Sequence, residues 1–194
     1  AFEEKALKEL KKFRLLQPIL KKEITDEGIK KAETVIERHK KSAVNAVIAL
    51  SNYSTSHTRF RDFLTRVCGC RYASMPLFEV SMLESSMNIN WTVLSKRTKS
   101  IAKIVNTAEA IEIKTPNGTH ITMSKKGRNA LSDDGILTKQ GSFSNLPAGE
   151  VFLAPVEGTA NGKLVLEWAP TRELKSPIIL IVKEGIVTEV VGDE

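Results

Sequence analysis

The spacing of apolar residues changes near residue 110, and this change limits the folds open to the chain. Before that point, apolar runs of strand length alternate with stretches in which apolar residues recur every three to four positions, as in helices. After it, Ala110–Thr115 and Thr119–Ser124 alternate on either side of Pro116-Asn117-Gly118. Asn-Gly between alternating segments is a strong hairpin signal. We therefore predict an α/β domain at residues 1–109 and a β-rich domain at residues 110–194.

The first domain contains three apolar runs that we predict as strands, at Phe13–Leu20, Ala43–Leu50 and Arg71–Met75. Helical patterns separate them, one capped by Thr25 or Asp26 and one covering Thr58–Val67. Strands that alternate with helices at this spacing favour parallel pairing through right-handed crossovers. The predicted fold class is α/β, with a Rossmann-like parallel sheet and flanking helices.

The rest of the chain reads as one long helix and several hairpins. Helical spacing runs from about Ser81 to Ala108, with an interruption near Asn88-Ile89-Asn90. Further hairpins are expected around Asn161-Gly162 and Glu184-Gly185, after the hairpin already described. A hairpin-rich segment of a second domain therefore follows the parallel sheet.

Charge and hydropathy argue against two classes of partner. The 194 residues carry 29 Lys and Arg against 23 Asp and Glu, a net charge of +6, and many Lys alternate with Glu in helical stretches. This small excess predicts no nucleic-acid partner. The longest apolar run, Pro177–Val182, is far shorter than the roughly 20 residues that cross a bilayer. We therefore expect no membrane partner.

The two cysteines and two of the three histidines favour structural roles. Cys68-Gly69-Cys70 contains the only cysteines, whereas a zinc site takes about four ligands. Free thiols fit a reducing compartment, so the chain is expected to be cytoplasmic. His39 closes a helix, and His120 lies in a hairpin strand, so neither is predicted to carry chemistry.

Two other residues are candidates for a functional site. His57 lies between an apolar strand and a helix, where an α/β sheet presents side chains to a ligand, although Ser56 or Thr58 beside it fits a helix N-cap equally well. Glu150 directly follows Pro147-Ala148-Gly149 and precedes an apolar run that we predict as a buried strand. A carboxylate on such a turn suits a metal ligand, and a surface Glu at a strand start is the alternative.

Four segments in this order resemble a known enzyme superfamily. They are Ser56–Arg61, Ala73–Pro76, Thr115–Thr119 with Lys126-Gly127-Arg128, and Asn145–Phe152. Together they resemble the leucyl aminopeptidase (aminopeptidase T type) metallopeptidases and their relatives, which include dihydroxypyridine dioxygenases. The resemblance extends from about Phe13 to Val191.

The resemblance implies an α/β domain, a second domain with divalent metals, and a homodimer. Glu150 matches the first metal-binding Glu of the superfamily, and its other ligands, which include a closing His-x-Asp pair, come later in the chain. This sequence has no His after His120. Because the chain also begins at Ala1 within a helical pattern, we expect a fragment that lacks the opening strand and the catalytic half. Such a chain is expected to be inactive alone.

Three functions follow as hypotheses. The first is a metal-dependent aminopeptidase that releases N-terminal residues from a peptide substrate, with zinc or cobalt held in part by Glu150 and with His57 at the substrate entrance. The second is an iron-dependent ring-cleaving dioxygenase, in which His57 accepts a proton from a substrate hydroxyl. The third is a binding or assembly module without catalysis.

Overall fold

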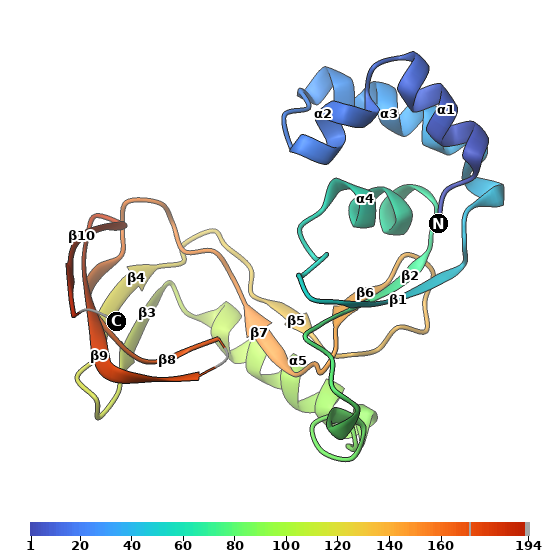
Figure 1. The fold of residues 1–194 in the computed structure, drawn as a ribbon. Helices are drawn as coiled ribbons and strands as arrows, with labels where there is room; N and C mark the ends of the chain where they lie inside the picture. The colour runs from blue at the N-terminus through green and yellow to red at the C-terminus, as the bar shows by residue number, and fades with distance from the viewer. Residues whose placement is uncertain (171, 193–194) are drawn as a thin grey trace. The chain divides into compact units, whose positions relative to one another are not determined.

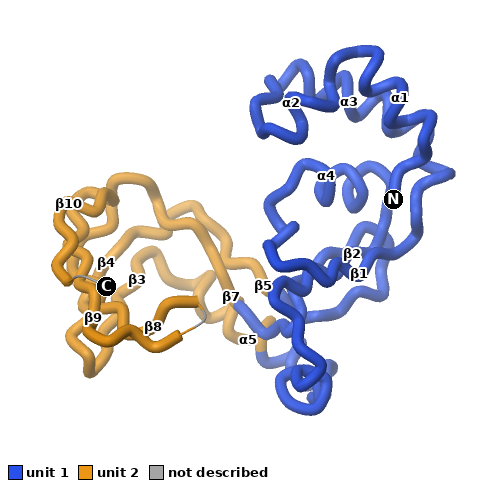
Figure 2. Tube along the Cα trace, viewed as in Figure 1, with its two compact units in different colours: residues 1–97, 133–150 blue, residues 98–132, 151–194 orange. Residues whose placement is uncertain are grey.

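The computed structural model describes residues 1–170 and 172–192 and shows a mixed α/β fold (Figure 1). The chain forms two compact units, residues 1–97 with 133–150 and residues 98–132 with 151–194 (Figure 2). Each compact unit therefore consists of two segments that are distant in sequence. The domain limits 1–109 and 110–194 remain a prediction.

The first unit is built on a small parallel sheet, and the α-helices within residues 4–62 lie on one side of it (Figure 1). Its strands are ordered β1-β2-β6, with β1 parallel to β2 and β2 parallel to β6. The strands are β1 (Ala46–Ser51), β2 (Arg71–Pro76) and β6 (Phe143–Asn145). The helical segments are α1 (Glu4–Lys12), α2 (Leu16–Lys21), α3 (Asp26–His39), η1 (Lys40–Ser42), α4 (Arg59–Asp62), the π-helical turn η2 (Phe63–Val67) and η3 (Val80–Leu83). The predicted α/β class with a parallel sheet is confirmed.

The core of this unit lies between the helices and the sheet. In Figure 1, α4 lies between the sheet and the layer formed by α1, α2 and α3. Phe63 joins the helices to a core made with Leu10, Ile19 and Ile36, and Leu64 begins a second core with Cys70 and Tyr72. The opposite side of β1 carries exposed apolar side chains, Ile48 and Leu50. The packing of Phe63 and Leu64, which directly follow α4, therefore holds this helix against the sheet.

The predicted strand at Phe13–Leu20 is wrong, because the chain forms helix α2 there. Pro18 is the third residue of this helix. Proline is tolerated in a first turn because the first four N–H groups of a helix have no intrahelical partner. The strand that completes the sheet is instead β6, far along the chain.

The second unit is built on a five-stranded antiparallel sheet, ordered β10-β9-β8-β4-β3. Its strands are β3 (Ala110–Lys114), β4 (His120–Ser124), β8 (Asn161–Ala169), β9 (Arg172–Lys183) and β10 (Ile186–Val191). The hairpins at Asn117-Gly118 and Glu184-Gly185 are confirmed. The one predicted at Asn161-Gly162 is wrong, because these residues begin β8, where Gly162 pairs with Ile121 and with Val182.

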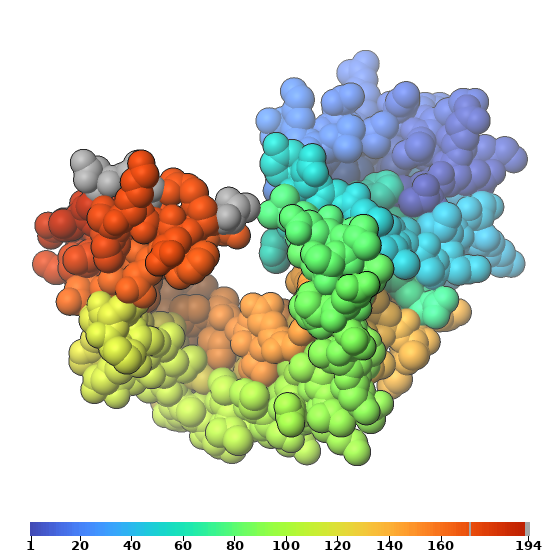
Figure 3. Space-filling model, turned by 60° about the horizontal axis from the view of Figure 1, so that its bottom comes forward, coloured from blue at the N-terminus to red at the C-terminus, as the bar shows by residue number. Residues whose placement is uncertain are grey.

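Helix α5 (Trp91–Thr107) and two short strands complete the fold. The predicted break near Asn88-Ile89-Asn90 is confirmed, but the helix expected from Ser81 is reduced to the short 3-10 helix η3, followed by turns up to Asn90. The strands β5 (Leu131–Asp133) and β7 (Glu150–Phe152) pair as a two-stranded sheet. The green atoms of α5 are visible at the surface in Figure 3, and two of its apolar residues, Ile101 and Ile104, are exposed. Among the described residues, no helix is both long and apolar enough to cross a bilayer.

Candidate functional site

Polar side chains lie near the carboxyl ends of the three parallel strands. We call this end of the sheet the sheet edge. Strand β1 ends at Ser51, β2 at Pro76 and β6 at Asn145. In open α/β sheets this edge is where ligands bind, because the loops that leave the strands meet there. The loop after β1 carries His57, and the turn after β6 leads to Glu150. The segments that carry His57 and Glu150 therefore both begin at the sheet edge.

His57 is exposed and lies beside the first turn of α4. It lines a pocket of about 230 Å³ together with Thr58, Arg59, Arg61 and Asp62. The N-cap of α4 is Thr58, whose side-chain oxygen accepts a hydrogen bond from the Arg61 N–H at 3.2 Å. The capping role considered for Ser56 or Thr58 thus belongs to Thr58, and Ser56 is left for another contact.

Ser56 is buried and is held from two sides. Its hydroxyl donates to Asn145 Oδ1 at 2.5 Å, and its carbonyl accepts from Arg61 Nε at 2.9 Å and Nη2 at 2.6 Å. The Arg61 guanidinium carbon lies 4.4 Å from the centroid of the Phe143 ring, a cation–π distance. Two residues of β6, Phe143 and Asn145, therefore hold the residue that precedes His57.

A buried carboxylate, Asp133, completes this network. Its Oδ2 accepts from the Asn145 N–H at 2.9 Å and from Asn145 Nδ2 at 3.2 Å, and its Oδ1 accepts from the Ser144 hydroxyl. Burying a carboxylate is costly unless hydrogen bonds replace its water. Three donors from β6 compensate Asp133, which links β5 firmly to the sheet edge.

Sequence reasoning missed Asp133. The segment Ser132-Asp133-Asp134-Gly135 has the composition of an ordinary turn. Its contact with β6 depends on the fold, and Ser144, the other missed residue, lies in a strand of only three residues. Asn145 was noticed only as part of the segment before Glu150.

Glu150 is exposed at the start of β7, after a cis peptide bond between Leu146 and Pro147. Gly149 before it has φ +119°, and its N–H donates to the Asp133 carbonyl at 2.9 Å. A Cβ on Gly149 would lie 3.0 Å from Leu94 Cδ1, so this turn favours glycine. The following strand is not buried as predicted, because Val151 is half-buried and Phe152 is exposed.

Comparison with known proteins identifies the family. Residues 10–194 match the model of the 2,5-dihydroxypyridine 5,6-dioxygenase (NicX) family. The chain belongs to this family. A comparison with curated proteins finds no match.

Two solved structures share the fold of this NicX-family chain. The 2,5-dihydroxypyridine dioxygenase from Pseudomonas putida KT2440 matches with a TM-score of 0.61 at 18% identity, over 85% of this chain and 46% of that chain. Wild-type AmpT from Thermus thermophilus matches with a TM-score of 0.51 at 16% identity, over 94% of this chain and 56% of that chain. The chain thus spans about half the length of either structure. The superfamily suggested by the four segments is confirmed, and a specific peptidase is not.

The side chains of this family member do not complete the metal centre that the superfamily implies. Among residues 1–170 and 172–192, no three His, Cys, Asp or Glu side chains gather as possible ligands. His39 lies 2.9 Å from a Glu9 oxygen, and His120 lies 2.9 Å from a Glu112 oxygen. Among these described residues, Glu150 therefore remains a single candidate ligand.

The two cysteines lie in or against the buried cores of the first unit. Burial is the main cause that raises the pKa of both thiols, Cys68 and Cys70, above the ordinary value. A raised pKa lowers the fraction of thiolate, which is the reactive form of cysteine. The structural role predicted for this pair agrees with its position against the core.

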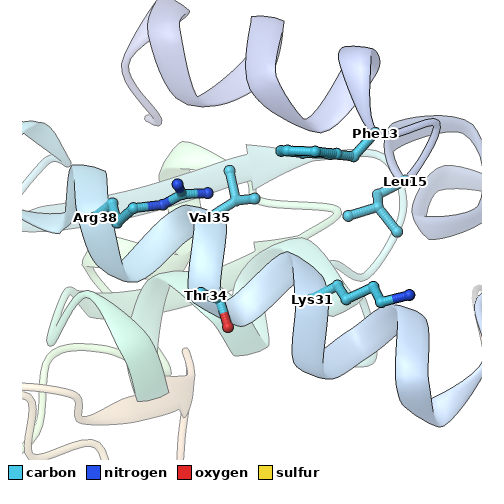
Figure 4. Close-up of a pocket in the computed structure, with 6 residues that line it drawn as sticks. All are labelled: Phe13, Leu15, Lys31, Thr34, Val35 and Arg38. Carbon is cyan, nitrogen blue, oxygen red and sulfur yellow. The ribbon is translucent and has the colours of Figure 1, made fainter.

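A larger pocket of about 460 Å³ lies away from the sheet edge (Figure 4). Its walls come from α3 and from the connection between α1 and α2. Two of its residues form ion pairs, Lys31 with Glu27 at 2.7 Å and Arg38 with Glu9 at 2.6 Å. The lining gathers no acid–base pair, so we place the candidate site at the sheet edge.

Proposed function

We propose that the natural protein is a ring-cleaving dioxygenase that acts on a dihydroxypyridine or a similar hydroxylated nitrogen heterocycle. The observation that carries this proposal is the family match, which covers residues 10–194. The fold shared with the Pseudomonas putida dioxygenase supports it. The sheet edge then supplies the part of the chemistry that this chain's own residues can perform.

The pocket at His57 offers a proton acceptor beside positive charge. An exposed imidazole can take the proton of a ring hydroxyl, provided that it lies within hydrogen-bond reach of the substrate. Arg59 lines the same pocket, and its guanidinium group would stabilise the oxyanion that remains, whereas the Arg61 guanidinium is bonded to the Ser56 carbonyl. A volume of about 230 Å³ suits a single ring, because drug-sized ligands occupy pockets of about 300–1,000 Å³. We assign His57 as the base.

An aminopeptidase is the second candidate. The likeness to AmpT, which extends over 94% of this chain, favours it. In that case the substrate is a peptide, the metal is zinc or cobalt, and Glu150 is one of its ligands. His57 then lies at the substrate entrance and is not a base.

Two assays on one preparation separate the candidates. The protein is expressed from its full reading frame and its metal content is measured. Oxygen uptake is followed with 2,5-dihydroxypyridine, and amino-acid release is followed with leucine p-nitroanilide. We expect the preparation to contain iron and to take up oxygen only when 2,5-dihydroxypyridine is present. We expect no amide hydrolysis. Zinc or cobalt with amide hydrolysis and no oxygen uptake would establish the aminopeptidase instead.

Two further expectations concern partners. The superfamily resemblance implies a homodimer, which sedimentation equilibrium measures directly. The small charge excess predicts no nucleic-acid partner. Binding of DNA or RNA at about 50 mM salt that weakens steeply as salt rises would support the third hypothesis, a binding module.

A further inference from the structure

The loop that carries His57 and the turn that carries Glu150 both contact one short strand, β6. Asn145, the last residue of β6, bonds to Ser56 directly before His57. Glu150 follows Asn145 by five residues through the turn at Gly149. Any change in the position of Asn145 therefore reaches both candidate residues.

Asp133 dictates the orientation of the Asn145 amide. An ionised carboxylate only accepts hydrogen bonds, so the Asn145 amide nitrogen must face it. The contact of 3.2 Å between Asn145 Nδ2 and Asp133 Oδ2 has this polarity. The amide oxygen is then turned towards Ser56, whose hydroxyl donates to it at 2.5 Å. The chemistry of the partners thus determines which end of the amide faces the His57 loop.

The same aspartate also holds the turn before Glu150. Its carbonyl accepts the Gly149 N–H at 2.9 Å, while its carboxylate holds Asn145. Asp133 is nearly buried, with 7% of its surface exposed, and Ser56 has 3% exposed. Hydrogen bonds in such surroundings are costly to leave unmade, so the link resists local motion.

We infer that Asn145, held by Asp133, is a positioning residue that places the His57 loop relative to the turn carrying Glu150. The inference rests on the proposed function, because it assumes that His57 meets the substrate. The His57 ring is exposed, so its place depends on the backbone anchor at Ser56. A displacement of about 1 Å at a catalytic group can cost about 100-fold in rate.

Two variants and a matched control test this link in the protein expressed from its full reading frame. Ser56→Ala removes the donor and Asn145→Ala removes the acceptor. Ser142→Ala is the control, because it removes a hydroxyl directly before the same strand, where it donates to the Lys139 carbonyl at 2.6 Å. Ser56→Ala removes the smaller group and carries the test if Asn145→Ala does not fold.

Steady-state oxygen uptake with 2,5-dihydroxypyridine gives kcat and KM for each variant. We expect Ser56→Ala and Asn145→Ala each to lower kcat at least tenfold, with KM changed less than threefold. The double variant is expected to be no slower than the slower single variant, because both break the same link. Ser142→Ala is expected to match the wild type. Unchanged kcat in folded Ser56→Ala, or losses that multiply in the double variant, would overturn the inference.

A second readout does not depend on turnover. The Cε1–H resonance of His57, assigned with a His57→Gln variant, is recorded without substrate. Ser56→Ala and Asn145→Ala are expected to shift or broaden it, and Ser142→Ala is expected to leave it in place. If the wild type shows no dioxygenase activity while this resonance responds, the proposed function fails and the positioning link stands. If the resonance does not respond, the link itself is wrong.

Discussion

The Arg61 guanidinium lies 4.4 Å above the Phe143 ring and donates two hydrogen bonds to the Ser56 carbonyl. A planar, forked cation suits both contacts, because it can stack on a ring and bond through its edge. Lysine offers one compact charge and cannot do both. The type of residue at position 61 therefore matters beyond its charge.

Arg61→Lys is expected to destabilise the protein by about 1–2 kcal/mol, through loss of the stacked cation and of the paired hydrogen bonds. The urea midpoint measures the loss. Arg66→Lys is the control, because Arg66 is half exposed and pairs with Glu33 and Asp62 at the surface. An exposed ion pair contributes about 0–1 kcal/mol. Equal effects at the two positions would show that stacking on Phe143 contributes nothing.

His57→Gln tests the proposed base. Glutamine keeps a polar side chain of similar length but cannot accept a proton at neutral pH. We expect kcat for the diol to fall by about 10²–10⁴-fold, the usual contribution of a positioned acid–base group, with no change in melting temperature. His120→Gln is the control, since His120 is exposed in β4 and contacts Glu112. If both variants retain wild-type turnover, His57 is not the base.

Local patterns were enough to predict the elements that local chemistry determines. Thr25, one of the two predicted caps, begins α3 by accepting the Gly28 N–H at 3.1 Å, and the hairpin predicted at Asn117-Gly118 forms. Strands β1 and β2 pair in parallel because the crossover between them contains a helix. Each of these features depends on residues that are close in sequence.

The remaining features depend on partners that are distant in sequence. Strand β6 has three residues, too few for a periodic pattern, and its pairing with β2 joins Tyr72 to Phe143. The apolar run before Lys21 could be a strand or a helix, since length and periodicity do not separate short runs. Asp133 lies at the candidate site only because β6, to which it bonds, pairs with β2. His57 and Glu150 could be singled out, whereas the network that holds them could not.

Gly162→Ala tests why Asn161-Gly162 forms part of a strand and not a turn. A Cβ there would lie 2.2 Å from the His120 carbonyl oxygen, and the φ of Gly162 is +139°. We expect a loss of more than about 3 kcal/mol, because backbone atoms of β4 would have to move. The urea midpoint, followed by circular dichroism, measures it.

Gly127→Ala is the control for that substitution. Gly127 also has a positive φ, +72°, but nothing lies within 4 Å of the added Cβ. Strain alone should cost about 1–2 kcal/mol there. If Gly162→Ala costs no more than Gly127→Ala, close approach of β4 is not the reason for the glycine.

The thiols of Cys68 and Cys70 are expected to react slowly while the protein is folded. Burial raises the pKa of both, so fewer thiolates are present near pH 8 than in the unfolded chain. The folded state then binds more protons than the unfolded state, and stability falls as pH rises through the thiol pKa of the unfolded chain. Iodoacetamide labelling at pH 8, with and without urea, measures the difference. Equal rates would contradict the burial of these thiols.

Glu150→Gln tests the proposed metal ligand. Glutamine has nearly the same volume and keeps the start of β7, but it lacks the negative charge. Because Glu150 is exposed, the melting temperature is expected to change little. If the carboxylate binds a metal in the full protein, metal content or turnover should fall at least tenfold, since an anionic ligand is lost.

Glu157→Gln separates a ligand effect from a general effect of lost charge. The Glu157 side chain is 79% exposed and pairs with Arg128 at 2.5 Å, so its substitution should leave metal content and turnover unchanged. Metal content, turnover and melting temperature are measured on the same preparation of each variant. If Glu150→Gln behaves like Glu157→Gln in all three, Glu150 is only an exposed residue at the start of a strand. The correspondence with the superfamily ligand would then be wrong at this position, even though the family match over residues 10–194 would stand.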